Sequence, residues 1–240
     1  MRATVFPTPG QPITADTWWT DAVGGEPETR SVKPATRQRQ EEGPFEGGGR
    51  LSLSINPLGV IQWQVTPEVP KDIPVDIPAV GPVEELSKPF LGLLNRWFRS
   101  TTCPTASRLA FGVTALLPVE DHARGYETLA SYLHALKIDP HNSFDLLYRI
   151  NRPRRSISEI QELRINRLST WVVQKISMVA GMESDPRSSS VISERYACAV
   201  ELDINTVPTF TGTFTSRDTS ALFSELERLA MEILAKGDVP

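Results

Sequence analysis

The chain has 240 residues, 40% of them hydrophobic, which suits one large domain, alone or with an appended N-terminal region, and can bury a substantial core. Its formal net charge of −4 excludes a protein whose whole surface is built to hold nucleic acid, although a local basic patch is compatible with it. The two cysteines, Cys103 and Cys198, lie far apart without metal-ligand spacing, so we expect reduced, buried thiols. We find no basic-then-apolar leader and no apolar run long enough to span a bilayer, and therefore expect a cytoplasmic protein.

Residues 1–49 differ in composition from the rest of the chain. They are rich in Pro, Gly, Thr and Glu, and we expect a largely irregular N-terminal arm because such a segment buries too little apolar surface to order itself. Trp18 and Trp19 are the exception. The pair indicates either a ring that packs on the domain and holds the arm down, or an exposed aromatic docking site for a partner.

A hairpin is predicted over residues 51–65. Apolar residues alternate with serines before the segment from Asn56 to Gly59, which has the residue preferences of a type I turn. On the returning strand, Ile61, Trp63 and Val65 are expected to face the core. The proline-rich segment 66–82 follows and is predicted to be a stiff linker crossing the surface.

Helical spacing of apolar side chains predicts a helix over about 88–99, with Ser87 as its cap and Pro89 in its first turn. From residue 108 onward, periodicity predicts the element order β-α-β-β-β-α. Of the two helices after residue 108, the first is expected to be capped by Asp121 and the second by Asp218, and Gly237 is expected to end the second. A serine-rich loop is predicted at 183–193.

These elements predict an α+β fold with a mainly antiparallel sheet and helices packed on one face. We expect residues 50–240 to form a single domain, with the β-α-β-β-β-α core preceded by the N-terminal hairpin.

The tetrapeptide Arg-Ile-Asn-Arg occurs twice, at 149–152 and 164–167, and six arginines fall within 19 residues. If both copies lie in strands of one hairpin, pairing Ile150 with Ile165 brings apolar side chains together. Arg149 and Asn151 would then face Asn166 and Arg164 on the other side of the sheet. Arg152, Arg154 and Arg155 are expected to continue this polar cluster into the connecting loop. In this register Tyr148 faces Arg167 on the apolar side, and the aliphatic stem of Arg167 must carry its guanidinium outward.

This cluster can hold phosphates or carboxylates in forked geometry, and Tyr148 and Trp171 could add stacking surface for single-stranded nucleic acid. A competing interpretation is internal neutralisation, because Glu201 and Asp203 share one face of a later strand. A protein interface is the third interpretation. The candidate anion- or nucleic-acid-binding residues are Arg149, Asn151, Arg152, Arg154, Arg155, Arg164 and Arg167.

No catalytic motif accompanies this cluster. The run Glu120-Asp121-His122 offers three ligand types, but consecutive residues rarely converge on one metal, and capping by Asp121 is the simpler role. His134 and His141 have no partner at a fixed spacing. We therefore expect no catalytic residues, no metal and no cofactor.

The segment from Asp145 to Asn151, DLLYRIN, resembles the R-Y-I-N segment of a sporadically distributed family of uncharacterised bacterial proteins of similar length. The run Leu202-Asp203-Ile204 is similar to that family's late L-D-I-D strand, and the likeness extends over residues 50–236 by order of elements. This chain departs from the family at Pro153-Arg154-Arg155 and in its proline-rich linker. The family has no assigned activity, and its patchy occurrence implies accessory roles such as mobile-element or phage-defence genes.

The sequence thus leads to three hypotheses. The first is a non-enzymatic interaction or adaptor subunit of a cytoplasmic bacterial assembly, with a protein partner and no membrane association. The alternative is an RNA- or DNA-binding module that uses the arginine-rich hairpin 149–167. The third, a hydrolase or nuclease built on Glu201 and Asp203, requires a metal between these two carboxylates.

Overall fold

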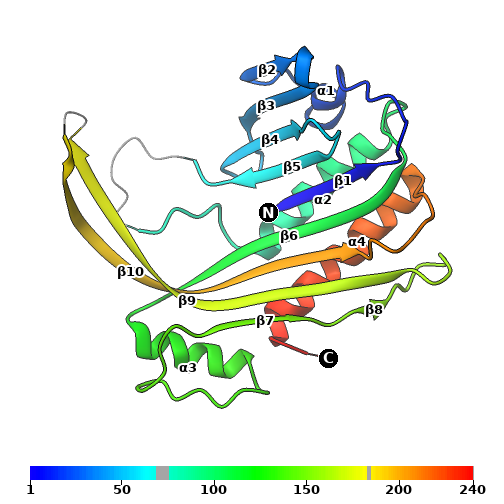
Figure 1. Cartoon of the computed structure of the whole chain (residues 1–240). Coiled ribbons are helices and arrows are strands. Elements are labelled where there is room, and N and C mark those ends of the chain that lie inside the picture. Colours follow the sequence, from blue (N-terminus) through cyan, green and yellow to red (C-terminus); the bar gives the residue numbers. More distant parts are fainter. Residues whose placement is uncertain (69–75, 183–184, 240) are drawn as a thin grey trace.

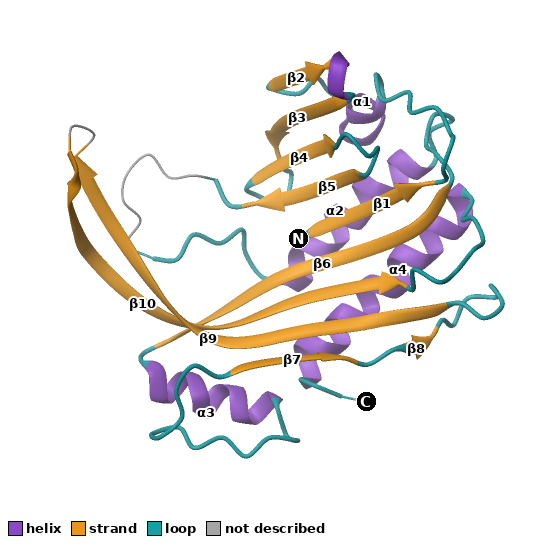
Figure 2. Cartoon of the chain, in the orientation of Figure 1, coloured by secondary structure: helices purple, strands orange, loops and turns teal. Residues whose placement is uncertain are grey.

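The computed structural model describes residues 1–68, 76–182 and 185–239. A single antiparallel sheet of ten strands organises these residues, and the helices pack on one of its faces (Figure 1). The opposite face carries no helix within the described ranges (Figure 2). The predicted α+β class, with helices on one face of a mainly antiparallel sheet, is confirmed.

The sheet has the strand order β2-β3-β4-β5-β1-β6-β10-β9-β7, and β8 also pairs with β9. In chain order the strands are β1 (Arg2–Pro7), β2 (Thr29–Lys33), β3 (Gln38–Pro44), β4 (Arg50–Ile55), β5 (Ile61–Thr66), β6 (Ala106–Val119), β7 (Leu147–Asn151), β8 (Arg154–Arg155), β9 (Arg164–Met182) and β10 (Asp185–Thr206). The helices are α1 (Trp18–Val23), the 3-10 turn η1 (Pro34–Thr36), α2 (Val83–Phe98), α3 (His122–Tyr132) and α4 (Ser216–Lys236).

The β4–β5 hairpin forms as the alternation of its residues predicts. Ile55 pairs with Ile61 across the turn, where the Asn56 side chain accepts from the backbone N–H groups of Leu58 and Val60 at 2.9 and 3.0 Å. Gly59 closes the turn with φ +79°, a conformation that glycine adopts without steric cost. The predicted inward-facing residues of the return strand are buried.

The predicted irregular arm over residues 1–49 is wrong. This segment contains β1, α1, β2 and β3, and β1 occupies the middle of the sheet between β5 and β6. Its inward-facing residues are the small Ala3 and Val5, so the segment has little of the bulky apolar content that marks a buried strand.

Trp18 and Trp19 both lie in the core, with exposed fractions of 0% and 1%. Trp18 packs edge-on against Trp97 of α2, and Trp19 stacks on Trp63 of β5. The anchoring interpretation therefore agrees with the structure. The docking interpretation does not, because buried rings cannot contact a partner.

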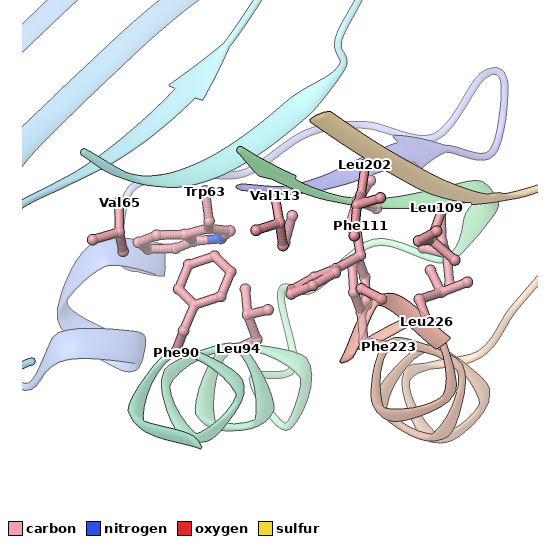
Figure 3. Close-up of a cluster of buried hydrophobic side chains, with 14 of the residues drawn as sticks. Trp63, Val65, Phe90, Leu94, Leu109, Phe111, Val113, Leu202, Phe223 and Leu226 are labelled. Atoms are coloured by element: carbon pink, nitrogen blue, oxygen red, sulfur yellow. The ribbon is translucent and has the colours of Figure 1, made fainter. Parts of the chain in front are cut away.

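The main core lies between the sheet and the helix pair α2 and α4 (Figure 3). Side chains from β5, β6 and β10 point towards both helices, which meet them with Phe90, Leu94, Phe223 and Leu226 (Figure 3). Helix α2 begins five residues earlier than predicted, and Pro89 lies inside it, so neither Ser87 nor Pro89 marks its start. Thr215, not Asp218, is the N-cap of α4, and Asp218 completes its capping box.

The predicted order of elements after residue 108 is confirmed, with β8 as an addition between β7 and β9. Gly237 is the C-cap of α4, and Asp121 caps α3 by accepting from the Arg124 N–H at 2.9 Å. The predicted serine-rich loop 183–193 is wrong, because β9 runs to Met182 and β10 begins at Asp185. Of the predicted linker 66–82, residues 69–75 lie outside the described ranges, and the described residues from 76 to 82 form no helix or strand.

Candidate interaction surface

The two copies of Arg-Ile-Asn-Arg lie in adjacent strands, as expected, but in a different register. Ile150 of β7 pairs with Ser169 of β9, four residues away from the predicted partner Ile165. Arg154 of β8 pairs with Ile165 at the same offset, so β7 and β8 form one interrupted ladder along β9. A shift by an even number of residues preserves the faces, so the predicted division of side chains between the two faces still holds.

Helix α4 explains why the register differs. The ladder continues to Ser156, whose N–H donates to the Leu163 carbonyl at 2.9 Å. The buried carboxylate of Glu225 on α4 accepts from the Ser156 hydroxyl at 2.6 Å and from the Ile157 N–H at 2.8 Å. This anchor lies 68 residues or more away in sequence, and a match of apolar side chains between two strands does not reveal it.

Three of the six arginines face the helices. The expectation that Arg152, Arg154 and Arg155 extend the polar cluster into a connecting loop is wrong, because Arg154 and Arg155 form β8 and Arg152 turns towards the helix-covered side. Arg152 donates from Nε and Nη2 to the two carboxylate oxygens of Asp238 at 2.6 and 2.8 Å. The pKa of Asp238 is lowered mainly by these hydrogen bonds, and the pKa of Arg152 is raised by them. Arg154 donates from Nη1 to Glu232 of α4 at 3.0 Å.

Arg167 is the third arginine on the covered face and is only 2% exposed. Its Nε and Nη2 have no hydrogen-bond partner among the described residues. Burial, followed by the nearby charge of Arg154, lowers its pKa. The expectation that its stem carries the guanidinium outward is therefore wrong.

The other three arginines face the open side of the sheet and are exposed. We call Arg149, Arg155 and Arg164 the arginine stripe. Arg155 pairs directly with Arg164 across β8 and β9, an arrangement of like charges that destabilises a sheet. None of the three side chains forms an ion pair or a hydrogen bond with a described residue. The stripe is thus an uncompensated positive surface.

Asn151, the remaining candidate, lies between the members of the stripe and begins a polar ladder across the open face. Its Nδ2 donates to Asn166 at 3.0 Å, and Asn166 in turn donates to Asn205 of β10 at 3.1 Å. Arg108 of β6 completes the ladder by donating to the same Asn205 oxygen at 3.1 Å. The side chain of Asn151 also accepts from the Arg167 N–H at 3.0 Å, so this residue is held on both sides.

The acidic strand residues do not neutralise the repeat. Glu201 and Asp203 lie on β10 beside β9, as proposed from sequence, but Glu201 pairs with Arg2 of β1 at 3.6 Å. Arg2 crosses β6 at Gly112, where a Cβ atom would lie 2.5 Å from Arg2 Nε. Asp203 accepts from Asn205 at 3.1 Å. Neutralisation does occur for two arginines, but through Asp238 and Glu232, two acids that no pattern near the repeat singles out.

An apolar row adjoins the stripe on the open face. Successive pairings align Leu147 of β7 with Val172 of β9, Val172 with Ala199 of β10, and Ala199 with Leu116 of β6. Leu147 is 64% exposed, and Val172 and Leu116 are partly buried. Arg149 lies in the next row on the same face. The open face therefore places the exposed Leu147 and its partly buried neighbours beside free guanidinium groups.

The stacking surface proposed for nucleic acid is absent from this face. Tyr148 and Trp171 pair with each other on the helix-covered side, where Trp171 is 3% exposed and stacks on Tyr132 of α3. Tyr148 donates its hydroxyl to Asp238 at 2.7 Å. Neither ring can receive a base from the open face.

No metal centre forms among the described residues, where no three His, Cys, Asp or Glu side chains gather closely enough to hold an ion. Within the same ranges, no helix is both long and apolar enough to cross a bilayer. We found no match to the chain among protein-family models, curated proteins or solved structures. The resemblance to the sporadically distributed bacterial family stays a prediction.

Proposed function

We propose that this protein is a non-enzymatic interaction subunit of a cytoplasmic bacterial assembly, and that it binds an acidic protein segment on the open face of its sheet. The observation that carries the proposal is the pairing of Arg155 with Arg164 on an exposed face without a described counter-charge. Carboxylates of a partner would remove the repulsion between them through forked hydrogen bonds. The family resemblance adds an accessory role, such as phage defence, to the proposal.

The apolar row favours a protein as the partner. Protein interfaces combine a desolvated apolar centre with arginine and a polar rim, and here Leu147 lies one row from Arg149. The polar ladder that begins at Asn151 adds hydrogen-bonding groups beside both features. A partner segment with apolar side chains flanked by Asp or Glu fits this arrangement.

The test compares two double variants with equal changes of charge. Arg155→Gln with Arg164→Gln removes the paired arginines, whereas Lys33→Gln with Arg37→Gln removes two exposed cations at the far end of the sheet. Each tagged protein is isolated from its native cells, and co-purifying proteins are quantified by mass spectrometry. We expect a partner shared by wild type and the control to be lost from the stripe variant. Equal recovery in both variants, or no partner with wild type, would contradict the proposal.

A lysine variant separates geometry from charge. Arg155→Lys with Arg164→Lys keeps both charges but removes the planar fork that binds a carboxylate with two hydrogen bonds. We expect partner recovery to fall with this variant while solubility is retained. Full recovery would show that any positive charge suffices and would remove the argument for carboxylate recognition.

Nucleic acid is the second candidate, because guanidinium pairs also bind phosphates. Tyr148 and Trp171 lie on the helix-covered side, so they cannot stack on bases at the open face, and a nucleic acid would be bound there through its phosphates. Fluorescence anisotropy with a labelled single-stranded RNA and a DNA duplex tests it over a range of salt. Binding through the three stripe arginines predicts a slope of log K against log salt of about −2 to −3. The variant Arg155→Gln with Arg164→Gln should bring this slope closer to zero.

A further inference from the structure

An apolar pocket of about 240 Å³ lies on the covered side of the sheet, behind the proposed interaction surface. Its floor comes from β6, β10 and β9, and its walls come from the first turn of α2 and the last turns of α3 and α4. An engineered apolar cavity of about 150 Å³ binds benzene, so this pocket has room for one substituted ring.

The floor and walls together present an aromatic surface and aliphatic side chains. Tyr132 of α3 and Trp171 of β9 stack with their ring centres 5.7 Å apart at an angle of 26°. Val200, Leu117 and Leu234 contribute aliphatic surface, and Leu117 is 48% exposed. A ring inserted here would bury apolar area that water now covers.

The pocket cannot close by a shift of α3 towards the sheet. Gly125 of α3 already approaches β9 so closely that a Cβ atom there would lie 2.7 Å from Val173 Cγ1. At the other end of α3, the Asp238 N–H donates to the Tyr132 carbonyl at 3.0 Å. Because both ends of the helix are held, the space beside it is built into the fold.

One charged side chain lines this otherwise apolar pocket. Glu84, in the first turn of α2, is exposed, and its carboxylate has no hydrogen bond or ion pair with a described residue. A pocket lined by both a carboxylate and an aromatic pair suits a cation, since aromatic faces attract ammonium groups and a carboxylate pairs with them. We propose that the pocket binds a small organic cation that has an apolar ring and one amine. This proposal does not rest on the arginine stripe, which lies on the opposite face, although Leu116 and Ala199 of the apolar row also line the pocket.

The test uses three probes of similar size and different charge: benzylamine, benzyl alcohol and benzoate. Binding is followed by NMR through the indole N–H signal of Trp171, assigned with Trp171→Phe. We expect benzylamine to bind about threefold more tightly than benzyl alcohol, as one solvent-exposed ion pair allows, and benzoate to bind more weakly than both.

Two neighbouring acids provide the matched control. Glu84→Gln should reduce benzylamine affinity to that of benzyl alcohol, whereas Glu85→Gln should leave it unchanged, because Glu85 shares the first turn of α2 but does not line the pocket. Ala115→Leu fills the pocket from its floor and should abolish binding of all three probes, with an unchanged melting temperature showing that the variant is folded. Absence of binding to the wild type, or equal effects of Glu84→Gln and Glu85→Gln, would overturn the proposal.

Discussion

A buried carboxylate at the far end of the sheet gives the sharpest test of the structure. Glu41 of β3 is 0% exposed and lies opposite Arg30 of β2. Its Oε1 accepts from Arg30 Nε at 2.6 Å and from Arg39 Nη2 at 2.8 Å. Glu41→Gln retains the shape of this side chain but removes its charge, so the prediction concerns the charge alone.

The expected loss of stability follows from the exposure of the two arginines. Removing one partner of a buried ion pair costs about 3–5 kcal/mol because the remaining charge stays in the interior. Arg39 is 10% exposed and would be left largely buried, but it retains Asp16 at 2.8 Å, and Arg30 is 40% exposed and can regain water. We therefore expect the low end, about 3 kcal/mol, equivalent to a decrease in Tm of about 6–12 °C for a chain of this size.

Urea unfolding followed by tryptophan fluorescence measures this difference, since Trp18, Trp19 and Trp63 are buried in the described core. The control is Glu42→Gln, one residue further on the opposite face, where the carboxylate accepts from Gln40 at 2.7 Å and is partly exposed. We expect the control to lose less than about 0.5 kcal/mol. A loss below about 1 kcal/mol for Glu41→Gln, or equal losses in both variants, would refute the argument.

Two further predictions concern the edge of the sheet beside α4. Asp238→Asn should lower the free energy of unfolding by about 1–2 kcal/mol at pH 7. Because Arg152 lowers the folded-state pKa of Asp238, the contribution of this carboxylate is present above its unfolded pKa and is lost as the pH falls below about 4. Urea unfolding at pH 7 and below about pH 4 should therefore show that the difference in free energy of unfolding between variant and wild type becomes small in acid. A difference that does not change with pH would contradict the ion pair between Arg152 and Asp238. For the register, Arg149→Cys with Thr170→Cys should form a disulfide under mild oxidation, and Arg149→Cys with Asn166→Cys should not. The opposite result, measured by mobility on non-reducing gels, would favour the register expected from sequence.

Local patterns account for the parts of the fold that could be predicted. The β4–β5 hairpin is defined by alternation and by the turn chemistry of Asn56 and Gly59, all within 15 residues. The capping of α3 by Asp121 is equally local. The central strand β1 escaped prediction because its inward-facing residues are small, and only its position between β5 and β6 buries it.

The candidate site shows the limit of the same reasoning. Strand parity places Arg149, Arg164 and Arg167 on the correct faces, and this part of the prediction agrees with the structure. Parity gave no face to Arg152, because it was expected in the connecting loop. The partner of Arg152 is Asp238, which is 86 residues away and follows α4. The partner of Arg154 is Glu232, which is 78 residues away in the last turns of α4. Nothing in the sequence near the repeat indicates that Asp238 and Glu232 contact its arginines. Local pattern therefore favoured Glu201 and Asp203 as the neutralising acids, and this prediction was wrong.

The division of the arginines also explains how the edge of the sheet is held. Because β7 and β8 pair with β9 at one offset, the segment Arg152-Pro153-Arg154-Arg155 directs two guanidinium groups to the helices and one to the open face. Pro153 removes a backbone donor from the edge, and exposed charges such as Arg149 discourage pairing with another chain. The ion pairs of Arg152 and Arg154 fasten this edge to α4 and the segment after it. A partner that binds the arginine stripe would therefore meet a surface that is already ordered, and less of its binding free energy would be spent on ordering.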